Sequence, residues 1–123
     1  MARRRRNDGF DQRLDWEIIV DANGPEEQAL GWYYYLENHL GFPFKARCMV
    51  ERPTSPLGVG DVVEVRGLPA EEVCEHEMFV NIAWQKRLLA VPLIQLMGGL
   101  AVDEGTEQAI QDWHTWVDRG YQL

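Results

Sequence analysis

The side chains best suited to chemistry lie in one seven-residue stretch. Residues 71–77 read Glu-Glu-Val-Cys-Glu-His-Glu, which places four carboxylates close together, on Glu71, Glu72, Glu75 and Glu77. Neighbouring carboxylates repel one another by about 1 kcal/mol per close pair even in water, and a bound cation removes that repulsion. Ca²⁺ takes about 6–8 oxygen ligands from carboxylates, backbone carbonyls and water, so the stretch is a candidate Ca²⁺ site. A solvated charged turn explains the same residues equally well.

A second candidate pair lies near the end of a predicted helix, at Glu37 and Asn38. The helix dipole disfavours an anion at a C-terminus, where the last carbonyls also lack partners, so a carboxylate there indicates a nearby cation. Asp103 and Glu104 lie instead at a predicted helix start, where capping and the dipole account for them. The sequence therefore predicts six metal ligands, namely Glu71, Glu72, Glu75, Glu77, Glu37 and Asn38.

Two familiar kinds of metal site fit the sequence poorly. Residues 21–24 read Asp-Ala-Asn-Gly, like the start of an EF-hand loop. The twelfth position of that loop, which requires a Glu, falls on Trp32. Cys74 and His76 could hold Zn²⁺, but their spacing matches no established zinc motif. We therefore expect Ca²⁺ outside an EF-hand and keep zinc as an alternative.

The composition indicates one globular domain without enzymatic activity. A chain of 123 residues with 46% hydrophobic residues is large enough to bury a core. The sequence has no nucleophile motif, no phosphate-binding glycine loop and no His-Glu-x-x-His pattern, so we expect no catalytic residue and no organic cofactor. No apolar run approaches the ~20 residues of a membrane span and no signal peptide is recognisable, so we expect a cytoplasmic protein.

Charge is distributed unevenly along the chain. Of the 12 Lys and Arg residues, five lie in residues 1–13, together with only two of the 20 acids. Residues 14–123 therefore carry 7 basic and 18 acidic side chains, a net charge of −11. We predict a flexible basic tail over residues 1–13 and a single acidic domain over residues 14–123. Such a domain repels nucleic acid and anionic membranes, so we expect a calcium ion and an unidentified protein as its partners.

The hydrophobic pattern predicts an α+β fold. Apolar residues at helical spacing predict helices over residues 25–40 and from about residue 103 to Gly120, which ends the second helix. Alternating or short apolar runs predict strands or extended segments at residues 16–20, 44–51, 61–67, 78–84 and 88–93. We expect a small antiparallel SH3-like β-barrel, flanked by an N-terminal and a C-terminal helix.

Four segments together resemble a known family. They are residues 17–44, 71–84, 89–96 and 103–117, and they contain the unusual strings Gly-Trp-Tyr-Tyr-Tyr-Leu-Glu and Cys-Glu-His-Glu-Met-Phe-Val. Over nearly the whole chain from residue 17 onward, the sequence is similar to the cyanobacterial calcium-binding protein family called CcbP. This resemblance implies a Ca²⁺ buffer or sensor in signalling, without an EF-hand.

One departure from the family and one alternative function remain. The resemblance implies an acidic residue after Leu36 and Glu37, where this chain has Asn38. An amide oxygen still ligates Ca²⁺ but carries no charge, so we expect weaker binding than in relatives. The alternative is a protein-interaction module with an SH3-like barrel and no ion dependence. It predicts an exposed aromatic patch formed by Trp32, Tyr34 and Tyr35.

Overall fold

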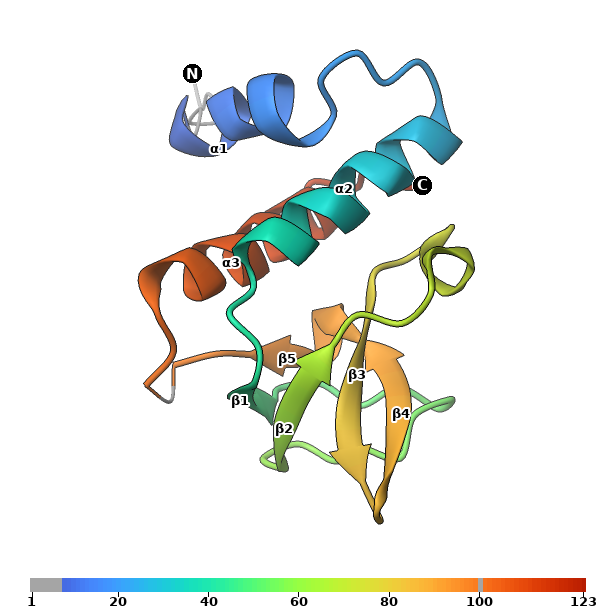
Figure 1. The fold of residues 1–123 in the computed structure, drawn as a ribbon, viewed down its shortest axis with the longest axis vertical. Helices are drawn as coiled ribbons and strands as arrows, with labels where there is room; N and C mark the ends of the chain where they lie inside the picture. Colours follow the sequence, from blue (N-terminus) through green and yellow to red (C-terminus); the bar gives the residue numbers. More distant parts are fainter. Residues whose placement is uncertain (1–7, 100) are drawn as a thin grey trace, which may run out of the picture.

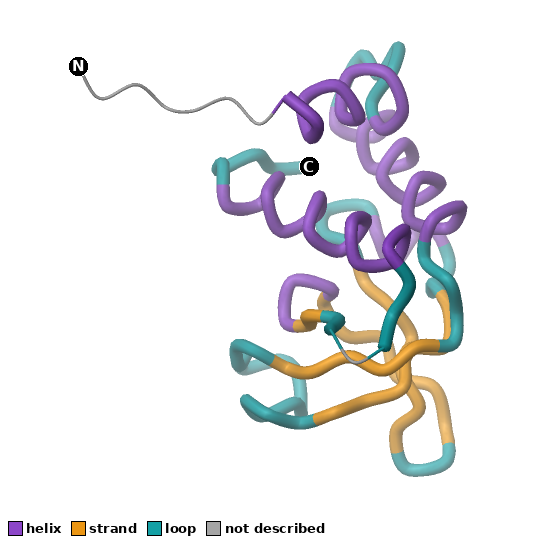
Figure 2. The backbone as a smooth tube through the Cα atoms, turned by 90° about the vertical axis from the view of Figure 1, so that its left-hand side faces the viewer, coloured by secondary structure: helices purple, strands orange, loops and turns teal. Residues whose placement is uncertain are grey.

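The computed structural model describes residues 8–99 and 101–123. Helices form one layer and a curved sheet forms the other, as Figures 1 and 2 show. In chain order the elements are α1 (Asp8–Arg13), the π-helical turn η1 (Leu14–Ile18), α2 (Pro25–His39), β1 (Phe44–Cys48), β2 (Val62–Gly67), the 3₁₀ turn η2 (Glu71–Cys74), β3 (Phe79–Trp84), β4 (Arg87–Pro92), the 3₁₀ turn η3 (Leu93–Gln95), β5 (Leu96–Met97) and α3 (Glu104–Asp118). The predicted α+β class is confirmed.

The sheet is antiparallel throughout, with strand order β4-β3-β2-β1-β5. Strands β3 and β4 form a hairpin whose two turn residues, Gln85 and Lys86, both have positive φ, at 49° and 69°. That conformation matches the right-handed twist of the paired strands. Because β4 and β5 lie at opposite edges of the order, the sheet is an open half-barrel (Figure 1). The SH3-like identity of this half-barrel stays a prediction.

Local sequence explains where the two long helices begin. Pro25 is the first residue of α2, where a fixed φ helps and the missing N–H is not needed. Asp103 caps α3, and its carboxylate accepts hydrogen bonds from the backbone N and the hydroxyl of Thr106 at 2.7 and 2.9 Å. The two helices meet through Trp32, which contacts Trp113 and Trp116 in edge-on geometry at 5.1 and 5.6 Å between ring centroids.

The N-terminal region differs from the predicted tail. Residues 8–13, assigned to that tail, form α1, and Phe10 is buried with 1% of its surface exposed. Arg13 donates two hydrogen bonds to Asp112 of α3, both 2.8 Å long. The tail prediction rested on the arginines and did not take the buried Phe10 into account. Its first seven residues, 1–7, lie outside the described part of the chain.

The strand or extended segment predicted at residues 16–20 is wrong for residues 16–18. The chain forms η1 there, with Leu14 and Ile18 buried and Trp16 73% exposed. Leu14 and Ile18 are four residues apart, which is the spacing of one helical face. Gly31 of α2 makes this placement possible, because a Cβ atom there would collide with the carbonyl oxygen of Ile18. Across residues 8–99 and 101–123, no helix has the length and apolar character needed to span a membrane.

Candidate metal site

The predicted acidic stretch lies in the connection between β2 and β3, as expected, and two adjacent tyrosines of α2 hold it in place. The Tyr33 hydroxyl donates to the carbonyl oxygen of Pro69 at 2.5 Å, and the Tyr34 hydroxyl donates to Oε1 of Glu71 at 2.6 Å. Cys74, which ends the η2 turn, is buried with 1% of its surface exposed. Glu71 and its acidic neighbours therefore project from a fixed backbone.

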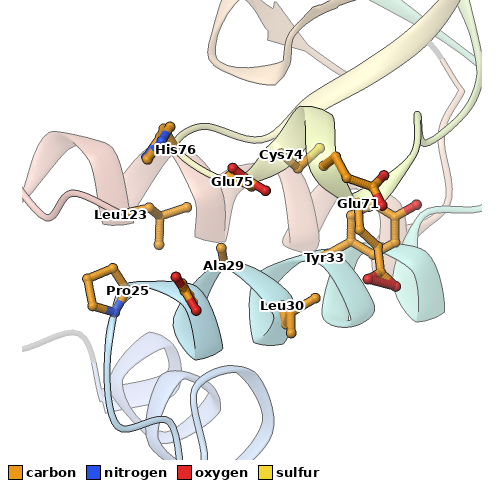
Figure 3. A pocket seen from close by; sticks show the side chains of 11 residues that line it. Pro25, Ala29, Leu30, Tyr33, Glu71, Cys74, Glu75, His76 and Leu123 are labelled. Atoms are coloured by element: carbon orange, nitrogen blue, oxygen red, sulfur yellow. The ribbon is translucent and has the colours of Figure 1, made fainter.

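An open pocket of about 520 Å³ lies between the start of α2 and the acidic stretch. Figure 3 shows Ala29 on the side of α2 that faces Cys74 and Glu75, while Pro25 lies at the start of the helix and Leu30 lies on another side of it. The complete lining consists of Pro25, Glu26, Ala29, Leu30, Tyr33, Glu71, Glu72, Cys74, Glu75, His76 and Leu123. Three of the six predicted ligands thus share one pocket.

The charge of Glu37 acts on the same tyrosines as the charges of the acidic stretch. Burial raises the pKa of Tyr33 most, and the negative charges of Glu37, Glu71 and Glu72 raise it further. The pKa of Tyr34 is raised first by its hydrogen bond to Glu71 and also by the charge of Glu37. The charges of both predicted groups therefore act on the same two tyrosines, although Glu37 and Glu71 are 34 residues apart in the sequence. 

Besides Glu37, two more predicted ligands lie outside the pocket lining. Glu77 binds Arg52 through two hydrogen bonds of 2.8 and 3.0 Å, so its charge already has a partner. Asn38 is exposed on the last turn of α2, about 100° around the helix from Glu37. Within the described residues, the carboxylates of Glu71, Glu72 and Glu75 form no ion pair.

The acidic side chains are near one another without converging. Across residues 8–99 and 101–123, no three His, Cys, Asp or Glu side chains lie close enough together to hold one metal ion. The exposed side chains of Glu72 and Glu75 can change rotamer, and that of Glu71 can do so if it gives up its hydrogen bond from Tyr34. The carboxylate oxygens of all three are the hard donors that Ca²⁺ prefers. The donor chemistry therefore fits Ca²⁺, provided that these side chains swing toward the ion.

The donors fit zinc less well. Burial raises the pKa of the Cys74 thiol, whereas zinc binds the thiolate. Its Sγ lies 3.4 Å from the backbone N of Phe79, which donates to it. Ring nitrogens of His39 and His114 lie 2.8 Å from the backbone carbonyls of Tyr35 and Leu96. Only His76 presents an exposed imidazole beside the acidic stretch.

The aromatic patch predicted by the alternative function is wrong. Trp32 and Tyr35 are 0% and 3% exposed, and only Tyr34 reaches the surface. Glu26, which is not among the six predicted ligands, also lines the pocket. Its spacing to Leu30 was the available signal, since residues four apart lie on one helical face.

Comparison with known proteins extends these observations. A protein-family model described as "Calcium binding", for the CcbP family, matches residues 12–117. The crystal structure of Anabaena CcbP is 35% identical in sequence, with a TM-score of 0.84 and 100% of both chains covered. A structure described as a calcium-binding protein in the calcium-binding form is 34% identical, with a TM-score of 0.85 and again 100% of both chains covered. Comparison with curated proteins gives no significant match.

Proposed function

Because the chain belongs to the CcbP family of calcium-binding proteins, we propose that it binds Ca²⁺ through the carboxylates of residues 71–77, together with Glu37 and Asn38. The family match carries this proposal, since it spans residues 12–117 and so includes all six predicted ligands. One of the similar solved structures is itself a calcium-binding form. The exposed carboxylates of the pocket, which form no ion pair with other described residues, supply the hard oxygen donors that such an ion needs.

Binding draws the exposed carboxylates together around the ion. Glu71 and Glu72 lie on the η2 turn and Glu75 directly follows it. Rotamer changes, with the loss of the Tyr34 hydrogen bond at Glu71, bring the three carboxylates closer. Backbone carbonyls and water complete the 6–8 ligands that Ca²⁺ usually takes. Glu37 contributes long-range charge from the end of α2, and Glu77 contributes only after it leaves Arg52. Binding to the folded chain stabilises it by mass action.

The anchored backbone favours a local response to the ion. Tyr33 holds Pro69, and buried Cys74 holds the end of the η2 turn. Ordering of side chains on such a frame suits a buffer better than a sensor, which needs an element with two arrangements. The family is one of calcium-binding proteins, and we propose no catalytic activity for this member. The cytoplasmic location and the protein partner stay predictions.

Calorimetric titration with Ca²⁺, Mg²⁺ and Zn²⁺ tests the function directly. We expect saturable heat with Ca²⁺, and the double variant Glu71→Gln/Glu75→Gln should weaken it by about tenfold or more, which corresponds to about 1.4 kcal/mol. The matched control is Glu104→Gln/Glu107→Gln, which removes the same charge from the exposed first turn of α3. Equal losses in both variants would show that only net charge matters, and unchanged binding in the first would place the ion elsewhere.

A further inference from the structure

The pocket beside the acidic stretch has two chemically different parts. Its rim carries carboxylates on opposite walls, with Glu26 on α2 and Glu71, Glu72 and Glu75 on the facing segment. The apolar part of its lining, the floor, includes Ala29, Leu30 and Leu123. A hydrated metal ion gains little from such a floor, because apolar surface stabilises only apolar groups that leave water. The floor therefore indicates a ligand with carbon atoms to bury.

The arrangement of the charges indicates the same kind of ligand. Four carboxylates line one pocket, yet within the described residues no three acidic, His or Cys side chains converge on a single point. A ligand that meets these carboxylates where they stand must carry several positive charges spaced along its length. The volume of the pocket, about 520 Å³, falls in the range of pockets that bind small organic molecules, roughly 300–1,000 Å³.

We propose that this pocket binds a small aliphatic polyamine. One ammonium group lies at Glu26, another lies among the carboxylates of Glu71 and Glu75, and the methylene chain between them covers Ala29 and Leu30. Each ammonium group donates up to three hydrogen bonds, which suits carboxylates that accept only. The exposed Tyr34, whose hydroxyl donates to Glu71, fixes one end of this arrangement.

Polyamine and Ca²⁺ then compete for the same carboxylates. This part of the inference rests on the proposed function, whereas the polyamine site itself stands on the pocket alone. The two ligands differ in what they need from the floor: the polyamine uses the apolar surface of Leu30, and the metal ion does not. A change confined to the floor therefore separates them.

The experiment is calorimetric titration of the full chain with spermidine, in buffer that contains a calcium chelator and physiological salt. We expect saturable binding that weakens about tenfold in Glu26→Gln/Glu75→Gln and stays unchanged in the control Glu104→Gln/Glu107→Gln. Leu30 is 40% exposed, so Leu30→Ser should fold normally. This variant should weaken spermidine binding about threefold, as expected for the loss of buried methylene contact, and leave Ca²⁺ binding unchanged.

Two further probes define the ligand class. Ethylenediamine, which carries fewer ammonium groups than spermidine and only two methylene groups, should bind at least about tenfold more weakly. A short lysine-rich peptide should bind no better than spermidine. The proposal is overturned if spermidine gives no saturable heat, if Leu30→Ser leaves its affinity unchanged, or if only the peptide binds. Ca²⁺ binding without spermidine binding rejects this inference alone, and spermidine binding without Ca²⁺ binding rejects the proposed function instead.

Discussion

Carboxylates occupy two opposite environments in this protein. Asp112 of α3 is 1% exposed and accepts hydrogen bonds from Arg13, Tyr35 and Gln108, which lie 2.6–2.9 Å away. Glu72 and Glu75 are exposed, line an open pocket, and form no ion pair within the described residues. The first carboxylate joins three helices, and the others leave their charge available to a ligand.

The difference teaches how burial decides the role of an acid. A buried carboxylate is tolerated only when donors and a countercharge surround it. Its charge and its acceptor oxygens are then satisfied within the fold. An exposed one keeps its hydration and its rotamer freedom, and a cation can recruit it at small cost. The composition of the chain counts both kinds alike, which is why the acidic excess alone does not locate a site.

Breaking the buried pair should give the largest effect. Arg13→Met keeps the aliphatic stem and removes the charge that faces Asp112, so a buried carboxylate loses its countercharge. We expect a loss of about 3–5 kcal/mol in the free energy of unfolding, measured with denaturant. The matched control is Arg66→Met, whose pair with Glu64 is 56% and 38% exposed and should contribute about 0–1 kcal/mol. Similar losses in both variants would contradict the comparison.

Removing one hydroxyl from the buried network should give a smaller effect. Tyr35→Phe deletes the 2.6 Å hydrogen bond to Asp112, which keeps its bonds to Arg13 and Gln108. We expect a loss of about 1.5 kcal/mol, the lower end for a hydrogen bond to a charged group.

The same variant makes a prediction about pH. Burial and then the bond to Asp112 raise the pKa of Tyr35 above its ordinary value of 10.0. A raised pKa stabilises the fold fully below pH 10, and that contribution is lost as pH rises through the folded-state pKa. Unfolding of the native protein should therefore become easier above pH 10 more steeply than unfolding of the Phe variant. Parallel curves would contradict this account.

The ion pair at the edge of the acidic stretch tests the exposed side of the comparison. Arg52→Gln releases Glu77, and since both side chains are partly exposed, at 37% and 26%, we expect a stability loss of at most about 1 kcal/mol. If Glu77 is a ligand, the variant should bind Ca²⁺ more tightly, because the ion no longer competes with a guanidinium. Unchanged affinity by calorimetry would remove Glu77 from the ligand set.

The smallest expected effect concerns the cap of α3. Hydrogen bonds from the backbone N and the hydroxyl of Thr106 lower the pKa of Asp103 below 3.8. A lowered pKa stabilises the fold above pH 3.8, and that contribution is lost as pH falls through the folded-state pKa. Asp103→Asn keeps a capping oxygen and removes the charge, so its stability deficit at neutral pH should shrink in acid. NMR titration of the Asp103 carboxyl checks the direction of the shift.

Much of the fold was readable from local sequence. Pro25 and Asp103 marked the starts of α2 and α3, and alternation of Phe44, Ala46 and Cys48 marked β1. These signals are local, so no tertiary information was needed. The region around Phe10 was assigned to the tail because its partners lie far along the chain: Arg13 bonds to Asp112, and Arg119 lies over the Phe10 ring.

The candidate site was only partly readable. The stretch at Glu71 to Glu77 is contiguous, so its charge density was visible, but the partner of Glu77, Arg52, lies 25 residues earlier. Likewise Glu26 reaches the pocket only because Tyr33 and Tyr34 hold α2 against that stretch. Pockets form where distant segments meet, and a single sequence does not show which segments those are.

The close contact at Gly31 has a consequence for sorting relatives. A side chain at this position meets the backbone of Ile18 rather than a movable side chain, so no rotamer change relieves the collision. A homologue with alanine at the equivalent of Gly31 must carry its first helices somewhere else, even if its acidic stretch is identical. Glycine at the position of Gly31 should therefore mark the family members whose N-terminal segment docks on α2. The number of arginines at the N-terminus should not.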